Sequence, residues 1–366
     1  MTFATSLKQQ SIIFFYFLSF ILLQALLITL ISSAILSALI VILADKKQWF
    51  LNQHDLIGVQ KFHHHPVPHV GGLAVFLSFS LGCYYLPPDI QGILQPILLI
   101  SLPVLVIGLI EDFSAKISPL WRLIFIFISI GMGFFYLDIG VSSLGFAWVD
   151  GWLSYSIIGF AFTLLVVGGA VNSVNVIDGY NGLMSGYAML ASTAMAIVAY
   201  QLGDLLIVQL DLLLIASILG FFLLNFPMGK LFMGDGGAYF IGLMLSMIGL
   251  VFVSRHDELS NWFVLLLLMY PMFELLFSIY RKKIIHNTPA SEPDPYHLHT
   301  LIHKILVKRN PKGNKIMNNS LTAPFLWVLS LLSIIPAIFW FDNKLVLIGW
   351  ACLFMLVYIV IYRRIQ

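Results

Sequence analysis

The sequence predicts an all-α membrane protein, a polytopic helical bundle of about eleven transmembrane helices forming a single domain over residues 1–366. First, 60% of the residues are hydrophobic and only 10% are charged, whereas a soluble domain is roughly half apolar and a quarter charged. Second, apolar runs long enough to cross a hydrocarbon core of about 30 Å recur along the whole chain. Third, if successive runs cross the membrane in alternating directions, nearly all basic residues lie on one side of the membrane.

Proline, glycine, asparagine and charged residues separate the apolar runs and mark the expected turns. We expect the first run to be retained as a helix, because no convincing signal-peptide cleavage site follows it. Its length fits either a tilted helix or an interfacial segment followed by a helix. The predicted helices cover residues 11–43, 70–86, 93–110, 117–137, 153–174, 183–202, 205–224, 238–253, 261–280, 321–341 and 345–362.

Basic residues orient the predicted bundle, because cytoplasmic loops near the membrane are enriched in lysine and arginine. Sixteen of the nineteen fall on one side, and only Lys8, Arg255 and Lys344 fall on the other. An odd number of spans places the two termini on opposite sides. The N-terminus is therefore expected outside the cell and the C-terminus in the cytoplasm.

Polar and glycine-rich segments gather on the predicted cytoplasmic side, and nine of the ten histidines lie there too. A transporter would carry ionisable groups near the membrane midplane, whereas the middles of these helices are expected to be apolar. The pattern favours a site where a water-soluble reactant meets a lipid headgroup, with a transporter as the alternative from another class. The five segments cover residues 61–72, 108–116, 172–182, 225–237 and 281–315.

An acidic pair, Glu111 and Asp112, follows the third apolar run, and Lys116 lies four residues after Asp112. Adjacent carboxylates at a membrane edge repel each other, so a divalent cation or a lysine is the expected partner. The alternative interpretation is an ordinary helix end that faces water.

A polar ladder of Asn172, Asn175, Asp178 and Asn181 occupies a turn between two predicted helices. Its glycines allow backbone amides to approach an anion, and the helix that starts near Leu183 would offer its N-terminal amides to phosphate. An asparagine-glycine turn with capping residues is the simpler alternative.

Asp235 lies in the segment Phe-Met-Gly-Asp-Gly-Gly, just before a predicted helix. A carboxylate beside free backbone amides suits magnesium bound to a diphosphate, because this ion takes few protein carboxylates and completes its shell with phosphate oxygens and water. A flexible turn is the alternative, but three carboxylate clusters on one face make it less convincing.

The last polar loop contains His297, His299 and His303. The spacing of His299 and His303 resembles a zinc-protease helix, but Thr300 occupies the position where that motif needs a glutamate. Histidine and lysine donors facing a diphosphate fit better, with a solvated basic loop as the alternative. The earlier run from His63 to His65 fits a phosphate contact and a polar loop equally well.

Together, the five segments resemble the polyprenyl-phosphate N-acetylhexosamine-1-phosphate transferases, which are glycosyltransferase family 4 of the membrane type. This family includes the phospho-N-acetylmuramoyl-pentapeptide transferase and the GlcNAc-1-phosphate transferases that start O-antigen, enterobacterial common antigen and teichoic acid linkage. The resemblance runs from Lys61 to His303. In order, the motifs are Lys-x-His with Pro and Gly-Gly, an acidic pair followed by Lys, Asn-x-x-Asn-x-x-Asp-Gly-x-x-Gly-Leu, Phe-Met-Gly-Asp-x-Gly, and His-x-His.

The resemblance implies roles for residues at matching positions. Asp235 would bind Mg²⁺, or Mn²⁺ in its place, and Glu111, Asp112 and Asp178 would form the catalytic group. Residues 281–320 would form a cytoplasmic loop that recognises the substrate. The implied substrate-binding residues are Lys61, His63, Lys116, Asn172, Asn175, His297, His299 and His303.

The chain departs from the family pattern at several positions. Glu111 stands where an Asp is usual, Asn181 replaces an Asp common in the peptidoglycan branch, and His69 stands where an Arg often precedes the Gly-Gly pair. The His-x-His sequence replaces the three-histidine cluster of the peptidoglycan enzymes. This last difference points away from a muramoyl-pentapeptide substrate, which stays as the alternative within the family.

The resemblance implies an enzyme of the bacterial cytoplasmic membrane whose site faces the cytoplasm. It would transfer N-acetylhexosamine-1-phosphate from a UDP-sugar, such as UDP-GlcNAc, to undecaprenyl phosphate and release UMP. The product would start a cell-envelope polysaccharide such as the O-antigen of lipopolysaccharide. The expected partners are the lipid phosphate, the UDP-sugar and membrane lipids, with no nucleic acid. Direct displacement or a phospho-enzyme, and a monomer or a homodimer, are left open.

Overall fold

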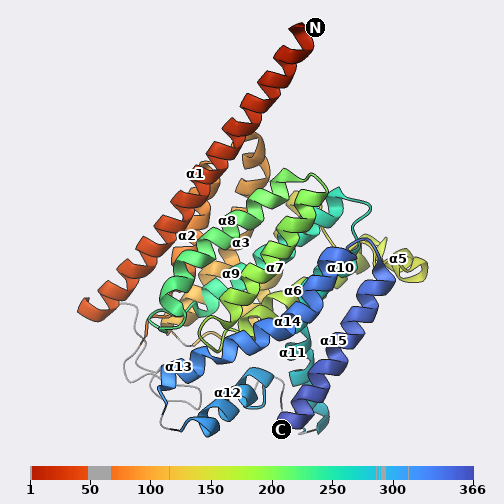
Figure 1. Ribbon diagram of the computed structural model, residues 1–366. Coiled ribbons are helices and arrows are strands. Elements are labelled where there is room, and N and C mark those ends of the chain that lie inside the picture. The colour runs from red at the N-terminus through yellow and green to blue at the C-terminus, as the bar shows by residue number, and fades with distance from the viewer. Residues whose placement is uncertain are drawn as a thin grey trace.

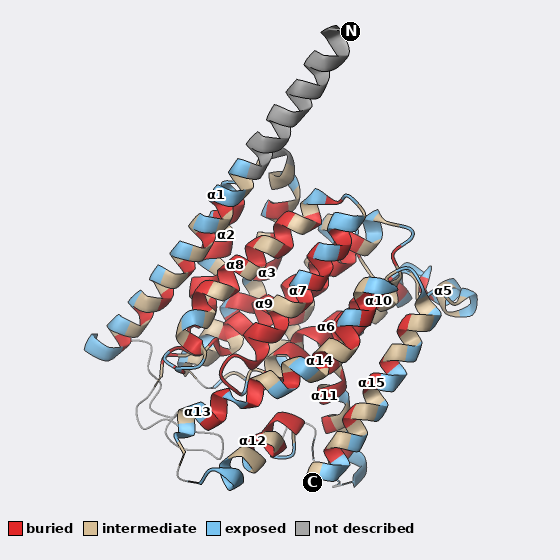
Figure 2. Ribbon diagram, viewed as in Figure 1, coloured by how far each residue is buried: buried red, intermediate tan, exposed pale blue. Residues whose placement is uncertain are grey.

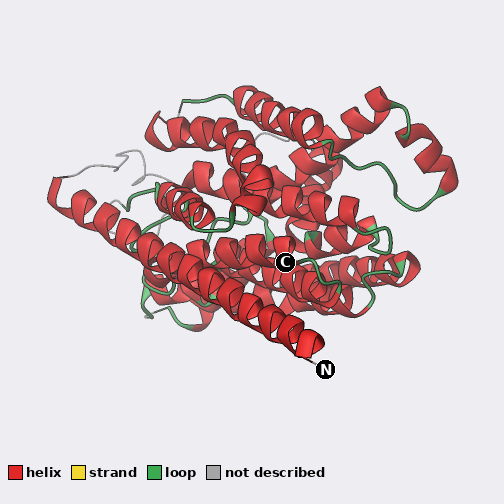
Figure 3. Cartoon of the chain, turned by 90° about the horizontal axis from the view of Figure 1, so that it is seen from above, coloured by secondary structure: helices red, strands yellow, loops and turns green. Residues whose placement is uncertain are grey.

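The computed structural model describes residues 2–47, 67–114, 116–285, 287, 289, 294–311 and 313–366. Within these ranges the regular elements are all helices, as Figure 3 shows from above. The all-α prediction is therefore confirmed. Lys61 and His63, and the rest of the run from His63 to His65, lie outside the described residues.

Fifteen α-helices and one short π-helical segment make up the described chain (Figure 1). Their bounds are α1 Thr2–Lys47, α2 Gly71–Tyr84, α3 Pro88–Ser114, α4 Pro119–Leu137, α5 Ala147–Leu153, α6 Ser156–Val176, α7 Leu183–Gln201, α8 Leu205–Asn225, α9 Gly234–Arg255, α10 Asn261–Leu267, α11 Met269–Tyr280, η2 Arg281–Ile285, α12 Leu298–Arg309, α13 Lys315–Ser320, α14 Thr322–Phe339 and α15 Lys344–Ile365.

The number of membrane spans is close to the prediction but differs in two places. Within the described ranges, nine helices are long and apolar enough to cross a membrane. A tenth span is the pair α10 and α11, which is bent by 72° at the break between them. The helix predicted at 70–86 is α2, whose 14 residues extend about 21 Å and fall short of the hydrocarbon core. The chain is thus a multi-pass membrane protein.

Helix α9 lies at the centre of the bundle, whereas α1 and α15 lie at its margin (Figure 2). Within the apolar window of α9, 94% of the residues are buried, compared with 22% for α1 and 28% for α15. The marginal helices expose large apolar side chains such as Ile35 and Leu345, which suits contact with lipid tails.

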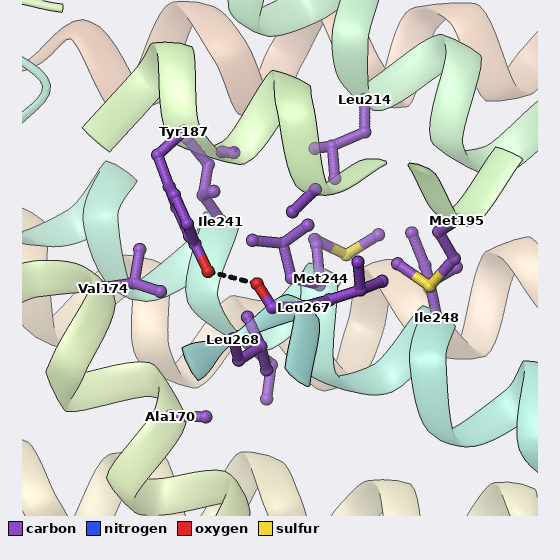
Figure 4. Packing of buried hydrophobic residues seen from close by; sticks show 14 of the residues in the cluster. Ala170, Val174, Tyr187, Met195, Leu214, Ile241, Met244, Ile248, Leu267 and Leu268 are labelled. Carbon is purple, nitrogen blue, oxygen red and sulfur yellow. Dashed lines mark hydrogen bonds between the residues drawn. The ribbon is translucent and has the colours of Figure 1, made fainter. Parts of the chain in front are cut away.

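Figure 4 shows the packing of buried side chains around α9. Tyr187 of α7 donates a hydrogen bond from its hydroxyl to the carbonyl oxygen of Leu267, the last residue of α10. This carbonyl lies at the break between α10 and α11, where the helical bonding pattern is interrupted. A side chain therefore satisfies an acceptor in an apolar region, where a bare carbonyl would be costly.

Small residues let α3 approach α9 closely. A Cβ atom on Gly108 of α3 would lie 2.3 Å from the Cα atom of Gly236 and 2.3 Å from its backbone nitrogen. Because these are backbone atoms, no side-chain rotation could make room. The contact brings the end of α3, with its acidic pair, against the start of α9.

The expectation that helix middles carry no ionisable groups is wrong at two positions. Asp211 lies inside α8 and Glu274 lies inside α11, and both are 0% exposed. Glu274 is accommodated because other groups donate hydrogen bonds to its carboxylate. A single acidic residue in an apolar run does not prevent a helix from crossing the bundle when such donors are present.

The start of α1 and the end of α15 lie at opposite ends of the bundle (Figure 1). This arrangement is compatible with termini on opposite sides of a membrane. The outside position of the N-terminus and the cytoplasmic position of the C-terminus remain predictions from the charge count.

Candidate functional site

Six helix ends meet at one end of the bundle and carry most of the predicted site residues. The C-terminal ends of α3, α6 and α8 meet the N-terminal ends of α4, α7 and α9, as hydrogen bonds between these ends show. Alternating helix directions produce this convergence, because each turn at that end joins one helix end to the next helix start. Polar residues at separate turns therefore become neighbours.

Asp112, at the end of α3, caps the start of α9. Its Oδ1 accepts a hydrogen bond from the backbone N–H of Asp235 at 2.7 Å, and its Oδ2 accepts one from Gly236 at 3.2 Å. A carboxylate is favoured at a helix N-terminus by the free N–H groups and by the helix dipole. The prediction of free backbone amides beside Asp235 is therefore wrong for these two groups.

Gly234 makes this cap possible. Its φ of +78° lies in the left-handed region, and a Cβ atom there would come within 2.5 Å of Asp112 Oδ2 and 1.9 Å of the carbonyl oxygen of His69. Glycine alone fits such a position without strain. The helix consequently begins at Gly234, four residues earlier than predicted, and Asp235 lies in its first turn rather than before it.

Asp235 is held by two side chains from other helices. Arg122 at the start of α4 donates from a guanidinium nitrogen to Oδ2 at 3.1 Å, and Asn175 at the end of α6 donates from Nδ2 to Oδ1 at 2.9 Å. About a quarter of the Arg122 and Asp235 side chains is exposed. The sequence analysis counted Arg122 only as a cytoplasmic charge and missed this contact.

Asp178 adds a third carboxylate from the turn between α6 and α7. Burial raises its pKa well above the usual range, and the negative charges of Asp235 and Asp112 raise it further. Like charges disfavour ionisation when they converge. Asp112, Asp178 and Asp235 therefore form an acidic cluster whose carboxyl groups are all ionised only beside a cation, and Arg122 supplies one positive charge at Asp235.

The acidic pair does not act as a unit in this structure. Glu111 turns towards its own loop, where Oε2 accepts a hydrogen bond from the backbone N–H of Ile117 at 2.7 Å. Lys116 in the same loop is exposed. Asp112 alone of the pair contacts α9, while Glu111 shapes the connection to α4.

The turn at the start of α7 is stabilised by protein groups where a phosphate was expected. The N–H of Asn181 donates to Oδ1 of Asn319 at 2.8 Å, and the N–H of Gly182 donates to Oδ1 of Asn225 at 2.7 Å. Asparagine side chains thus already bind the two amides that precede α7, while the phosphate contact expected at the first amides of the helix itself stays a prediction. Asn172 donates to the carbonyl oxygen of Gly168 in its own helix.

The three late histidines lie at the start of and within α12. The His297 ring stacks on the His299 ring with centroids 4.9 Å apart, and Nε2 of His299 lies 3.7 Å from the position of a Cβ atom on Gly179. Tyr180 contacts the rings of His299 and His303. The histidines thus pack against the turn that carries Asp178.

His299 does not carry the positive charge that was expected of a histidine donating to a phosphate. Its side chain is 1% exposed, and burial lowers its pKa to about 3 even though the charge of Glu274 acts in the opposite direction. The ring is therefore neutral at ordinary pH. His303 is buried as well, and its Nδ1 lies 3.3 Å from the carbonyl oxygen of Asn318.

Two buried acidic residues that the sequence analysis did not single out tie α12 to the membrane helices. Glu274 of α11 contacts His297, and Asp294 contacts Ser278 and Arg281. Hydrogen bonds, chiefly from Ser278, Tyr296 and Arg281, lower the pKa of Asp294 to about 2 although burial opposes this shift. A glutamate inside an apolar run was the available signal for Glu274.

The predicted recognition loop at 281–320 contains ordered helices. Its described part includes η2, α12 and α13, so it is largely helical rather than an extended loop. Within the described ranges, no three His, Cys, Asp or Glu side chains are grouped closely enough to hold a metal ion by themselves. A metal here would need further ligands.

Comparison with known proteins agrees with this arrangement. The sequence profile described as glycosyl transferase family 4 matches residues 94–253. A probable undecaprenyl-phosphate N-acetylglucosaminyl 1-phosphate transferase of Bacillus subtilis is 30% identical over 244 residues, which are 66% of each chain. This chain belongs to glycosyl transferase family 4. The family predicted from the five motifs is thereby confirmed.

Two further relatives carry similar names at lower identity. The undecaprenyl-phosphate alpha-N-acetylglucosaminyl 1-phosphate transferase of Thermotoga maritima is 26% identical over 69% of this chain and 73% of its own. The transferase of the same name from Yersinia pestis is 28% identical over 66% of this chain and 67% of its own. The chain thus matches about two thirds of the length of these relatives. The matched profile includes Asp112, Asp178 and Asp235, but not the late histidines.

Proposed function

We propose that this chain transfers N-acetylglucosamine-1-phosphate from UDP-GlcNAc to a polyprenyl phosphate in the membrane and releases UMP. Membership of glycosyl transferase family 4 supports this proposal, as do the names of the relatives from Bacillus subtilis and Thermotoga maritima. These names specify N-acetylglucosamine rather than a muramoyl-pentapeptide, and a transferase rather than a transporter. They favour this reaction over both alternatives.

The convergence of Asp112, Asp178 and Asp235 at one end of a membrane bundle carries the proposal. Carboxylates from three separate turns meet where α3, α6 and α9 reach the end of the bundle. An apolar bundle has no structural need for such a centre, since burying like charges is costly. A site that handles phosphate and a cation at a membrane surface gives the three residues a common purpose.

The residues fit a magnesium ion. Carboxylate and amide oxygens are hard ligands, and the excess negative charge of the three aspartates favours a cation. Asp235 would hold the ion, with Asp178 beside it, and phosphate oxygens and water would complete the shell. When bound, magnesium neutralises charge on the diphosphate and stabilises UMP as the leaving group. Mn²⁺ could replace it, since it accepts similar oxygen ligands.

The protein's own residues position the reactants. A lipid phosphate is largely dianionic at neutral pH, because its second pKa is about 6, so its attack on the sugar-bearing phosphorus needs little help from a base. Arg122, Lys116 and His297 would offset the charge of the diphosphate. The cap that Asp112 provides for α9 favours direct displacement over a phospho-enzyme. A covalent aspartyl intermediate would require Asp112 to give up part of that cap.

An apolar groove supports a lipid acceptor. It has a volume of about 540 Å³ and lies between α3 and α4, the helices that carry Asp112 and Arg122. A long prenyl chain needs an apolar path beside the place where its phosphate reacts, and this groove is lined by two helices that reach the site.

The proposed cellular setting is the bacterial cytoplasmic membrane, with the site facing the cytoplasm, where UDP-sugars are made. The charge count supports this orientation, because Lys46, Arg363 and Arg364 lie at the same end of the bundle as the aspartates. The lipid diphosphate sugar would start a cell-envelope polysaccharide such as an O-antigen.

The decisive experiment incubates purified protein with polyprenyl phosphate, Mg²⁺ and a panel of UDP-sugars, and measures UMP. We expect release with UDP-GlcNAc and loss of release when a chelator removes the metal. Asp235→Asn should lower the rate about 100-fold or more while the protein remains folded. Asp257→Asn, an exposed carboxylate at the opposite end, is the matched control and should retain full activity. Full activity of Asp235→Asn would end the assignment of the metal to this residue.

A further inference from the structure

Glu274 is a fully buried carboxylate that joins three separate elements. It lies on α11, five residues after the first residue of that helix. Its Oε1 accepts hydrogen bonds from Nδ1 of His297 at 2.9 Å and from the N–H of Leu298 at 3.0 Å. Its Oε2 accepts one from the hydroxyl of Tyr358 on α15 at 2.8 Å. A residue of a membrane helix therefore binds both the start of α12 and the last helix.

These contacts determine which nitrogen of His297 carries a hydrogen. The N–H of Leu298 can only donate, so Oε1 of Glu274 acts as an acceptor. His297 Nδ1, bonded to the same oxygen, must then be the donor. Nε2 is consequently the ring nitrogen that is left for a substrate, in the same way that a carboxylate orients a metal-binding or catalytic histidine.

His297 is the most exposed of the three late histidines and lies next to the catalytic turn. Its side chain is 12% exposed, whereas His299 and His303 are buried. It stacks on His299, which in turn packs against Gly179, the neighbour of Asp178. Movement of the His297 ring would therefore alter the histidine-lined part of the site beside the turn that carries Asp178.

A second contact fixes the segment that enters α12. Asp294 accepts hydrogen bonds from Ser278 and from Arg281, and the Arg281 guanidinium lies 4.8 Å from the centre of the Tyr362 ring. Because this pairing holds the path of the chain, loss of Glu274 should free the His297 ring without releasing α12. The role of Glu274 can thus be separated from the folding of the region.

We propose that Glu274 is a positioning residue that holds His297 through Nδ1–H, so that Nε2, when it carries the second ring proton, donates a hydrogen bond to an oxygen of the diphosphate of the nucleotide sugar. The proposal rests on the proposed function for its substrate. Glu274→Gln keeps the size of the side chain but removes its negative charge. The amide oxygen can still accept from His297 and Leu298, but it does so without the charge that strengthens the bond to His297, and Tyr358 must accept where it now donates.

Steady-state kinetics with UDP-GlcNAc and polyprenyl phosphate test the proposal. Glu274→Gln should lower kcat/KM for UDP-GlcNAc about 10-fold to 100-fold and leave KM for polyprenyl phosphate unchanged. Glu274→Asp, which retains a carboxylate, should recover part of the loss. Asp211→Asn removes another fully buried carboxylate, away from the site, and should leave both KM values unchanged.

A double-mutant cycle separates positioning from a general structural role. If Glu274 acts through His297, the variant carrying both Glu274→Gln and His297→Gln should be no worse than His297→Gln alone. Losses that multiply, or a rise in KM for both substrates, would overturn the proposal. Thermal unfolding and size-exclusion profiles of each variant identify any that fail to fold, and Glu274→Asp then replaces Glu274→Gln in the cycle.

A measurement without substrate keeps the inference distinct from the proposed function. Diethyl pyrocarbonate modifies accessible histidine rings, and mass spectrometry locates the products. The rate at His297 should rise in Glu274→Gln but not in Asp211→Asn, because the bond that holds the ring is weakened. An unchanged rate would overturn the positioning role, whereas failure of the wild-type protein to release UMP from any UDP-sugar would overturn only the proposed function.

Discussion

Burial and neighbouring charges shift the pKa values of two side chains at this site in opposite directions. Asp178 is disfavoured as an anion, and His299 is disfavoured as a cation. Both effects follow from removing a charged group from water. A cation beside Asp178 would reverse its preference, whereas His299 remains a neutral ring that supports its neighbours. The residue types alone suggested two charged groups.

The low pKa of His299 predicts a loss of stability in mild acid. In the unfolded chain a histidine takes up a proton near pH 6.5, but folded His299 does so only near pH 3. The unfolded state therefore binds more protons below pH 6.5, so the contribution of His299 to stability is present above that pH and is lost as the pH falls. Between pH 6.5 and 5 the loss should be about 2 kcal/mol.

Thermal unfolding in detergent at several pH values checks this expectation. His299→Gln should flatten the decline in unfolding temperature between pH 6.5 and 5 relative to the unsubstituted protein. Parallel curves for the two proteins would show that His299 is not the group responsible.

At the level of elements, the crossing of α3 and α9 determines the geometry of the site. Gly108 and Gly236 allow backbone contact, and this contact brings Asp112 to the first turn of α9. Interfaces between membrane helices often use small residues in this way, since close packing replaces the hydrophobic effect within lipid. The cap at Asp112 and the crossing at Gly108 are therefore parts of one arrangement.

Gly108→Ala should separate α3 from α9 and weaken the site. The added Cβ would lie 2.3 Å from backbone atoms of Gly236, so the helices must move apart, at a cost of about 1 to 3 kcal/mol. We expect a lower unfolding temperature and reduced UMP release. Gly92→Ala, on the same helix with nothing within 4 Å of the added atom, is the matched control. Equal behaviour of the two variants would contradict the proposed importance of the crossing.

At the scale of the whole molecule, the bundle separates an apolar middle from a polar end. Helices α3, α4, α6, α7, α8 and α9 contribute that end, while α1 and α15 present apolar side chains at the margin. This division suits a protein that takes one reactant from water and one from lipid. It also makes the orientation in the membrane essential, because only the side with the aspartates can meet a UDP-sugar in the cytoplasm.

Cysteine labelling in intact cells tests the orientation. In a background that lacks Cys83 and Cys352, a membrane-impermeant maleimide should label Ser154→Cys at one end but not Lys308→Cys at the other. Both positions are exposed in the structure. Labelling of Lys308→Cys should appear only after the membrane is made permeable. The reverse pattern would invert the predicted topology.

The sequence by itself determined the helical membrane class and most of the residues of the site. Apolar runs are local features, so the spans followed from them, except for the short α2 and the break between α10 and α11. Asp178 and Asp235 were recognisable because carboxylates beside glycine are unusual at the ends of membrane helices, and Asp112 because it belongs to an acidic pair. Lys61 and His63 lie outside the described residues and remain predictions.

Only the tertiary structure decided which of these groups meet. Asp112 binds a backbone amide 123 residues away, Arg122 binds Asp235 across 113 residues, and Glu274 binds His297 across 23 residues. Such contacts depend on which helices pack together and how closely, and no local pattern encodes this. The backbone amides of Asp235 and Asn181 were expected to be free. They are instead bound by Asp112 and Asn319, because burial requires a partner for each polar group.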